Sequence, residues 1–200
     1  MIKISDLSFA RGNQLILKNI NIEIRPSEVL LVKGANGKGK TTLLSCIANL
    51  LEPLSGSITY FSDKIDSAIT SKNFTFWGEE NYGIEDFSII KNIHYWLNAN
   101  NASPKEENIK KTISYLYGSI DIKKKFSTLS YGQKRKIKIL LLMLIDKPVW
   151  ILDDPYNGLD DETIHRLNEI ILLKRRGNGI IIIASHQHPK IEEVKEFQIL

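Results

Sequence analysis

The fold is decided by one stretch, Gly34-Ala35-Asn36-Gly37-Lys38-Gly39-Lys40-Thr41-Thr42 (GANGKGKTT), which fits the phosphate-loop pattern G-x-x-x-x-G-K-[ST]. It follows a short apolar run at 29–34 and opens a helical pattern at 39–51. The glycines let backbone N–H groups surround phosphate oxygens, and the helix adds the positive end of its dipole. We expect Lys40 to reach the β- and γ-phosphates of a nucleotide and the Thr41 hydroxyl to ligate Mg²⁺.

Outside this stretch, apolar runs alternate with helical patterns. Strands are predicted at 29–34, 73–78, 149–153 and 179–185, and helices at 39–51, 131–146 and 161–174. Fully apolar strands separated by helices indicate an α/β fold with a parallel sheet covered on both faces. Residues 1–9 and 16–24 alternate apolar and polar side chains, which is typical of half-buried antiparallel strands. The segment 52–61 is predicted as a turn and a strand, and the tail 191–200 as a short helix and a strand.

Between Ile84 and Leu129 the sequence pattern changes from strand-like apolar runs to helical spacing. Residues 88–99 and 105–118 have helical spacing, and Ser103-Pro104 followed by two glutamates is a good helix start. We therefore expect one domain over 1–200 that contains a helical subdomain at approximately 84–130.

Composition sets broad limits on the class of protein. The net charge of +4 is an ordinary solvated basic excess that also suits an anionic ligand or membrane surface. Cys46, the one cysteine, lies in an apolar helical pattern and is expected to be a small buried side chain in a reducing compartment. No secretory signal and no transmembrane run is expected, so any work at a membrane needs a partner that holds the chain there.

A second motif, LSYGQ at 129–133, precedes a helix. Ser130 can cap that helix, and Gly132 allows close approach of another backbone. It is thus a second helix N-terminus suited to an anion. One nucleotide does not need two such ends from one subunit, so we expect a head-to-tail homodimer in which each LSYGQ closes over the partner's nucleotide.

The run VWILDDP at 149–155 leads an apolar strand into two carboxylates and a proline. Paired acids at the end of a buried strand are typical of a metal ligand or a catalytic base. The alternative for Asp154 is that it only caps the following turn.

The chain resembles an ABC-type ATPase over essentially its whole length. The resemblance lies in the motifs and their order: the phosphate loop, the helical insert, LSYGQ, VWILDDP, NGLD (157–160) and His186. The resemblance implies ATP and Mg²⁺ as cofactors and catalytic roles for Lys40, Asp154 and His186. Asp153 would hold Mg²⁺, Asp154 would polarise the attacking water, and His186 would contact the γ-phosphate. Residues 157–160 would communicate across the dimer. The resemblance also implies that Ser130, Gly132 and Gln133 bind the γ-phosphate of the partner's nucleotide.

Three positions depart from the common ABC pattern. Asp154 stands where the family usually has a glutamate, and its shorter side chain suggests slow hydrolysis. Glu79 or Glu80 stands where a glutamine is usual; Glu80 is retained as a possible Mg²⁺ contact. Arg11 stands where an aromatic residue usually stacks on adenine, and a guanidinium can stack in the same way. Phe9 is the alternative, although it is expected to point into the core.

Weaker similarities spread along the chain resemble the ATP-binding subunits of cytochrome c maturation systems. They imply a peripheral protein on the cytoplasmic face of an inner membrane, with integral membrane partners that handle haem, and no nucleic acid. The alternatives are the ATPase of another ABC transporter, a soluble ABC protein acting on DNA or the ribosome, and a non-hydrolysing nucleotide switch.

Two lysine clusters and three further histidines are interpreted mainly as surface or packing residues. The lysine clusters at 123–125 and 134–138 are interpreted as solvated faces, with the second also a candidate for steering ATP. His94, His165 and His188 are expected at the surface or in packing roles.

Overall fold

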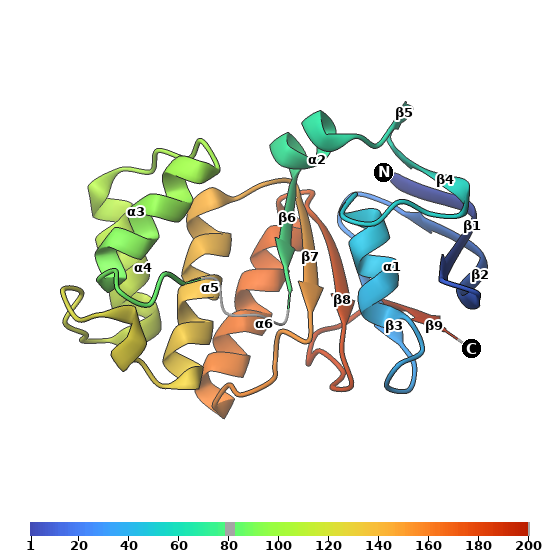
Figure 1. Cartoon of the computed structure of the whole chain (residues 1–200). Coiled ribbons are helices and arrows are strands. Elements are labelled where there is room, and N and C mark those ends of the chain that lie inside the picture. The colour runs from blue at the N-terminus through green and yellow to red at the C-terminus, as the bar shows by residue number, and fades with distance from the viewer. Residues whose placement is uncertain (79–82, 200) are drawn as a thin grey trace. The chain divides into compact units, whose positions relative to one another are not determined.

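The computed structural model describes residues 1–78 and 83–199 (Figure 1). Glu79 and Glu80, for which contacts with Mg²⁺ or a partner are predicted, lie outside these described residues. The chain divides into two compact units. The first comprises Met1–Glu79, Lys147–Pro155 and Ile171–Leu200, and the second comprises Glu80–Asp146 and Tyr156–Ile170.

The first unit is built around a parallel sheet with the strand order β6-β7-β8-β3-β9. Its strands are β3 (Val29–Lys33), β6 (Phe74–Trp77), β7 (Val149–Asp153), β8 (Ile180–Ala184) and β9 (Val194–Gln198). Every residue of β7 and β8 is buried, which explains why these strands read as unbroken apolar runs. The predicted α/β architecture with a parallel core is confirmed.

An antiparallel sheet with the order β2-β1-β4-β5 completes the first unit. Its strands are β1 (Ile2–Arg11), β2 (Gln14–Ile24), β4 (Ser55–Tyr60) and β5 (Asp63–Lys64). Ile2 pairs with Ile24 and Ile4 with Ile22, so the inward residues of the alternating pattern meet across the strands. Helix α1 (Lys40–Ile47) packs against β7 and β8 and contributes to one shared core. Burial raises the pKa of the Cys46 thiol on this helix to about 11, so it serves as a small core residue.

The second unit is helical (Figure 1). Its elements are α3 (Ile89–Ala99), α4 (Glu106–Tyr117), the 3₁₀ turn η1 (Phe126–Thr128), α5 (Tyr131–Ile145) and the first part of α6 (Asp161–Arg176). Helices α3 and α4 both pack against α5. The buried amide of Asn92 fixes the entry to α3, because it accepts from Ile84 N at 2.8 Å and donates to Ile84 O at 3.0 Å. The predicted helices at 88–99 and 105–118 are thus confirmed.

Four features differ from the sequence-based expectations. The tail contains β9 but no helix among its described residues, because Glu193 has a φ of 55° and Arg175 holds the Glu192 carbonyl. Helix α2 (Ser67–Asn73), capped by the Asp66 side chain, was not predicted. Lys105, rather than Ser103, precedes the first turn of α4.

The fourth difference concerns the cluster at 134–138. The lysines at 123–125 are exposed as expected, but Arg135 is fully buried and Lys138 is 5% exposed, so the expectation of a solvated face was wrong there. Helix α5 packs on several neighbours at once, and this burial overrides the polarity of its sequence.

No helix in the ranges 1–78 and 83–199 combines the length and apolarity that crossing a bilayer would require.

Replacing Ile182 by alanine is expected to lower the free energy of unfolding by about 2–5 kcal/mol. Ile182 is fully buried at the centre of β8 and pairs with Leu30 on one side and Ile151 on the other. The matched control is Leu173→Ala, at a position that is 64% exposed, and it should change stability by less than about 0.5 kcal/mol. Urea unfolding of both variants measures the difference. Equal losses would contradict the proposed core.

Candidate functional site

The register of the parallel sheet aligns the ends of three strands. Ala184, the last residue of β8, pairs with Val32 of β3 and with Asp153 of β7. The residues that follow these strands therefore emerge side by side from one edge of the sheet. They are the phosphate loop, the second aspartate and the segment that carries His186.

The phosphate loop requires glycine where it enters α1. Gly39 has a φ of 100°, and a Cβ there would lie 2.9 Å from Ile16 Cγ2. Only glycine combines this conformation with such close packing. Within the loop, Lys38 N donates to Ala35 O at 3.3 Å, which closes the turn.

Lys40 lies over the loop that it follows. Its Nζ donates to Gly34 O at 2.8 Å and to Ala35 O at 3.2 Å, and it lies 3.3 Å from His186 Nε2. The lysine and the histidine, separated by 146 positions, thus meet above the loop. Both are placed to face an anion bound by the loop amides.

Two of the three residues predicted to ligate Mg²⁺, Thr41 and Asp153, contact each other. Thr41 Oγ1 donates to Asp153 Oδ2 at 2.7 Å, and Asp153 is 5% exposed. A hydroxyl and a carboxylate are hard oxygen donors, and Mg²⁺ in nucleotide sites is held by one or two such groups besides water and phosphate. The chemistry of this donor pair therefore fits Mg²⁺.

Asp154 has an unusual backbone conformation. Its φ is 46°, and its N–H donates to Ala184 O at 2.8 Å, so β7 ends in a sharp turn held by β8. Ser185 Oγ donates to Asp154 Oδ1 at 3.3 Å and accepts from Gln187 N at 3.0 Å. Ser185 was not predicted as a site residue. A polar residue between a buried strand and His186 was the signal that could have found it.

These residues line one cavity of about 590 Å³ in the first unit. Its walls comprise Arg11, Ile16, Asn36, Gly37, Gly39, Lys40, Thr41, Thr42, Asp153, Asp154, Ala184 and His186. Arg11 lies at the end of β1 and is exposed, whereas Phe9 packs partly buried against the core. The cavity therefore brings together most of the predicted nucleotide and catalytic residues.

The remaining predicted ligands belong to the second unit. Ser130 caps α5, accepting from Gln133 N at 3.2 Å, while Gln133 Oε1 accepts from Ser130 N at 3.0 Å. This reciprocal capping box presents a well-formed helix N-terminus, as the sequence predicted. Gly132 passes close to another backbone, since a Cβ there would lie 3.1 Å from Gly158 O.

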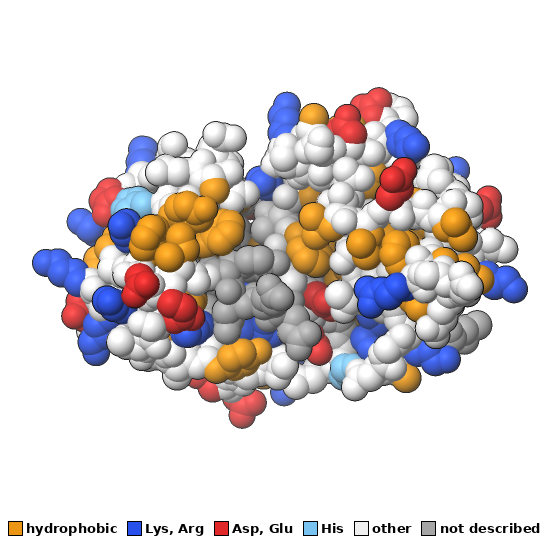
Figure 2. Space-filling view, viewed as in Figure 1, with side chains coloured by type: hydrophobic (Ala, Val, Ile, Leu, Met, Phe, Trp, Pro, Cys, Tyr) orange, Lys and Arg blue, Asp and Glu red, His pale blue; other side chains and the backbone are white. Residues whose placement is uncertain are grey.

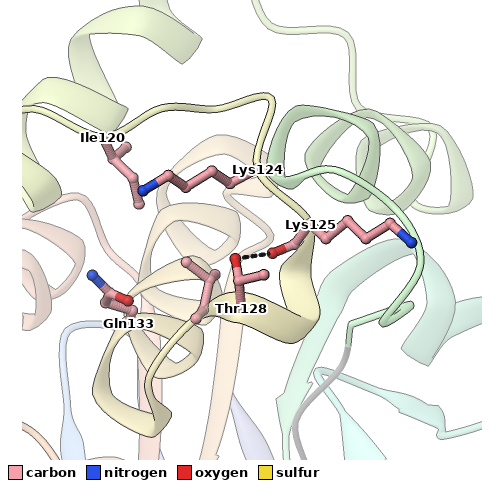
Figure 3. A pocket seen from close by; sticks show the side chains of 6 residues that line it. Ile120, Lys124, Lys125, Thr128 and Gln133 are labelled. Carbon is pink, nitrogen blue, oxygen red and sulfur yellow. Dashed lines mark hydrogen bonds between the residues drawn. The ribbon is translucent and has the colours of Figure 1, made fainter.

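A second cavity, of about 360 Å³, flanks this helix N-terminus (Figure 3). Its walls are Ile120, Lys124, Lys125, Thr128, Leu129 and Gln133. The Lys124 and Lys125 side chains extend in different directions, and Thr128 Oγ1 donates to the Lys125 carbonyl at 2.7 Å. The wall is thus partly apolar, with ammonium and amide groups at its edge.

The family described as "ABC transporter" matches residues 17–157. The chain belongs to the ABC transporter family. It is an ATP-binding subunit, and the family activity is ATP hydrolysis. The matched range contains the phosphate loop, the capped α5 and the paired aspartates.

Relatives and solved structures agree with this membership. "Cytochrome c biogenesis ATP-binding export protein CcmA" of Reclinomonas americana is 32% identical over 95% of this chain and 86% of its own length. A "putative ABC transporter (ATP-binding protein)" from Pyrococcus furiosus has a TM-score of 0.86 and 27% identity, covering 99% of this chain and 96% of its own. A dimeric ATP-binding cassette described as a post-hydrolysis state bound to ADP and Pi shares the fold, with a TM-score of 0.78, 20% identity and coverage of 94% and 88%.

Replacing Ser185 by alanine is expected to lower kcat for ATP hydrolysis by about 5-fold, with KM for ATP within about 2-fold of wild type. The reason is that the Asp154 carboxylate loses a hydrogen bond, and such a bond contributes on the order of 1 kcal/mol. Ser185→Thr keeps the hydroxyl and should retain most of kcat. Steady-state phosphate release measures both variants. Equal kcat values for the alanine and threonine variants would contradict a role for the hydroxyl.

Proposed function

We propose that the chain works as one half of a homodimer, and that its ATP hydrolysis powers the haem-related step of cytochrome c maturation at a membrane complex. The observation that carries the catalytic part is the shared cavity in which Lys40, Asp154 and His186 lie beside the Thr41–Asp153 pair. The name of the relative from Reclinomonas americana supports the biological part.

In this mechanism the phosphate loop binds the nucleotide and stabilises developing charge. Lys40 and the amides of residues 34–42 face the β- and γ-phosphates, and His186, beside Lys40, contacts the γ-phosphate. Arg11 stacks on the adenine at the mouth of the cavity. Of these groups, Lys40 and His186 lie together above the loop before ATP arrives.

Thr41 and Asp153 would hold Mg²⁺, and their hydrogen bond already keeps the two oxygens together. When bound, the ion supplies positive charge that offsets the charge of the phosphate oxygens. Glu80, proposed as a further contact, lies outside the described residues.

Asp154 orients the attacking water and accepts its proton. The water oxygen forms the new bond to the γ-phosphorus while the bond to the β-phosphate oxygen breaks, giving ADP and phosphate. The carboxylate is one methylene shorter than the glutamate common in the family, and Ser185 and the strained turn at Asp154 fix its position. A displacement of about 1 Å can lower a rate by about 100-fold, so we expect slow hydrolysis.

The second half of each nucleotide site comes from the partner copy. Ser130, Gly132 and Gln133 would bind the γ-phosphate of the ATP held by the other chain. The support for this is the capped N-terminus of α5, which presents the positive end of the helix dipole. A cassette with the same fold is described as dimeric, which supports this arrangement.

The helical unit is the proposed contact for integral membrane subunits on the cytoplasmic face. Its α3 carries exposed aromatic surface: Tyr95 is 46% exposed and makes edge-to-face contacts with Phe87 and Trp96. Lys91 Nζ lies 3.9 Å from the centre of the Phe87 ring. Figure 2 shows apolar side chains gathered over this part of the molecule. Haem is handled by these partners, and no nucleic acid takes part.

Substitutions at Asp154 test the catalytic part. Asp154→Asn should abolish phosphate release because the amide cannot accept a proton, whereas Asp154→Glu should hold or raise the rate. The control Asp63→Asn removes an exposed carboxylate of β5 in the same unit and should leave the rate unchanged. Single-turnover phosphate release measures all three variants.

Two outcomes would overturn this assignment. An unchanged rate in both Asp154 variants would show that another group activates the water. A wild-type dimer that closes with ATP and Mg²⁺ and never reopens would replace hydrolysis by a nucleotide switch.

Affinity purification from native membranes with ATP and vanadate tests the biological part. Mass spectrometry should recover integral membrane components of cytochrome c maturation, and the variant Tyr95→Asp should recover less of them. Recovery of a different permease would discard the haem-related assignment. Recovery of ribosomal or DNA-repair proteins alone would discard the membrane complex.

A further inference from the structure

Strand β9 borders the entry to the phosphate loop. It pairs in parallel with β3, and the last pair joins Gln198 to Lys33. Ile199 N donates to Lys33 O at 2.9 Å, and a Cβ on Gly34 would lie 3.2 Å from Ile199 O. The backbone at the start of the loop is therefore held by β9 and by the residue that follows it.

Glu196 of β9 contacts two other segments of the first unit. Lys33 Nζ donates to Glu196 Oε1 at 2.5 Å, and His188 Nε2 lies 3.0 Å from the same oxygen. The hydrogen bond from Lys33 lowers the pKa of the Glu196 carboxyl, so the charged form makes these contacts. Lys33 comes one residue before the phosphate loop, and His188 comes two residues after His186. One carboxylate thus joins the start of the loop to the segment that carries His186.

The His188 ring faces an acceptor with each of its nitrogens. Nδ1 lies 2.8 Å from Pro189 O, and Nε2 lies 3.0 Å from Glu196 Oε1. Both contacts are hydrogen bonds at once only in the imidazolium form, because a neutral ring carries a single N–H. The carboxylate then lies between two cations, His188 and Lys33. The three side chains are 36% to 49% exposed, so water weakens these contacts without removing them.

The backbone is held on both sides of His186. Before it, Ser185 is buried, and its Oγ accepts from Gln187 N at 3.0 Å. After it, the contact of His188 with β9 holds the chain. The exposed His186 ring lies between these two points and reaches to 3.3 Å from Lys40 Nζ. The place of this ring above the phosphate loop therefore depends on a backbone that the two contacts fix.

We infer that Glu196 is a positioning residue: through His188 it fixes the backbone that places His186 above the phosphate loop, with Lys33 as its anchor on the loop side. The inference rests on the proposed function, in which His186 contacts the γ-phosphate. Glu196 and His188 are absent from the residues that line the nucleotide cavity, so they act on the reaction through His186 and do not touch ATP. Loss of either side chain lets the His186 ring shift relative to Lys40.

The first test removes the carboxylate. Glu196→Ala loses both contacts, and we expect the rate of ATP hydrolysis to fall about 5-fold. This is less than the loss of about 100-fold that a displacement of about 1 Å can cause, because the contacts are partly exposed. Glu196→Gln keeps an oxygen acceptor at the same reach and should stay within about 2-fold of wild type. The affinity for ADP, which lacks the γ-phosphate, should change by less than about 2-fold in both variants. Single-turnover phosphate release and titration with ADP measure these values.

A double-mutant cycle shows whether Glu196 acts through His186. In the His186→Ala background, Glu196→Ala should lower the rate by less than about 1.5-fold, because no ring remains to be positioned. A structural role elsewhere in the chain would leave the full loss of about 5-fold. Where the His186→Ala chain hydrolyses ATP too slowly to measure, the same cycle is run on the affinity for a non-hydrolysable ATP analogue relative to ADP.

Two more variants keep the test decisive. His188→Ala changes a loop residue, so it should fold even if a substitution in β9 does not, and it should lower the rate as Glu196→Ala does. Glu23→Ala is the matched control. Glu23 lies on β2 of the same unit, is 41% exposed and accepts from Arg25 Nε at 2.9 Å, so its replacement also breaks a partly exposed ion pair on a strand. It should leave hydrolysis unchanged.

The outcomes separate this inference from the proposed function. If wild type hydrolyses ATP and the alanine variants at 196 and 188 keep its rate, the positioning role is overturned and the proposed function stands. The same holds if these variants lower the rate equally with and without the His186 ring. If wild type neither binds nor hydrolyses ATP, both are overturned. A loss in both variants that disappears in the His186→Ala background supports the positioning role.

Discussion

The site depends on one constraint, the in-register pairing of β8 with β3 on one side and β7 on the other. Ala184 pairs with both Val32 and Asp153, so these strands finish at the same level. A shift of one residue in the pairing of β7 with β8 would turn Asp153 to the opposite face of the sheet. It would then lose its contact with Thr41, which is only 2.7 Å long. The apolar packing of the sheet thus sets the positions of the charged groups.

This constraint also explains the conformation at Asp154. The chain must leave β7 without continuing the sheet, and the bond from Asp154 N to Ala184 O produces that turn with a φ of 46°. Left-handed backbone at a non-glycine residue is uncommon and costs on the order of 1 kcal/mol or more, and it persists only where the surroundings determine it. Here the turn directs a short carboxylate toward the cavity, and the Ser185 hydroxyl contacts it. The shorter carboxylate of Asp154 is therefore attached to a backbone whose conformation is closely fixed.

How far the sequence predicted the fold and the site depends on the range of the interactions involved. The phosphate loop, the apolar strands and the cap at Ser130 depend on local patterns, and all could be placed from the residues alone. The burial of Arg135 and the absence of the predicted helix from the described part of the tail, 191–199, depend on contacts with distant segments. Ser185 was missed because its partner lies 31 positions away. Which residues contact ATP, Mg²⁺ or a partner remains a prediction.

The buried cation of α5 extends the same reasoning to the second unit. In the first unit, the packing of apolar strands fixes the positions of polar groups. In the second, polar contacts from α5, among them the bond from Arg135 Nε to Asn157 O, hold the loop 157–160. Hydrophobic contacts would allow the start of α5 and the loop 157–160 to slide, because they are non-directional. A guanidinium bonded to the Asn157 carbonyl does not allow that sliding without leaving a buried donor unpaired, which costs more than a shifted apolar contact.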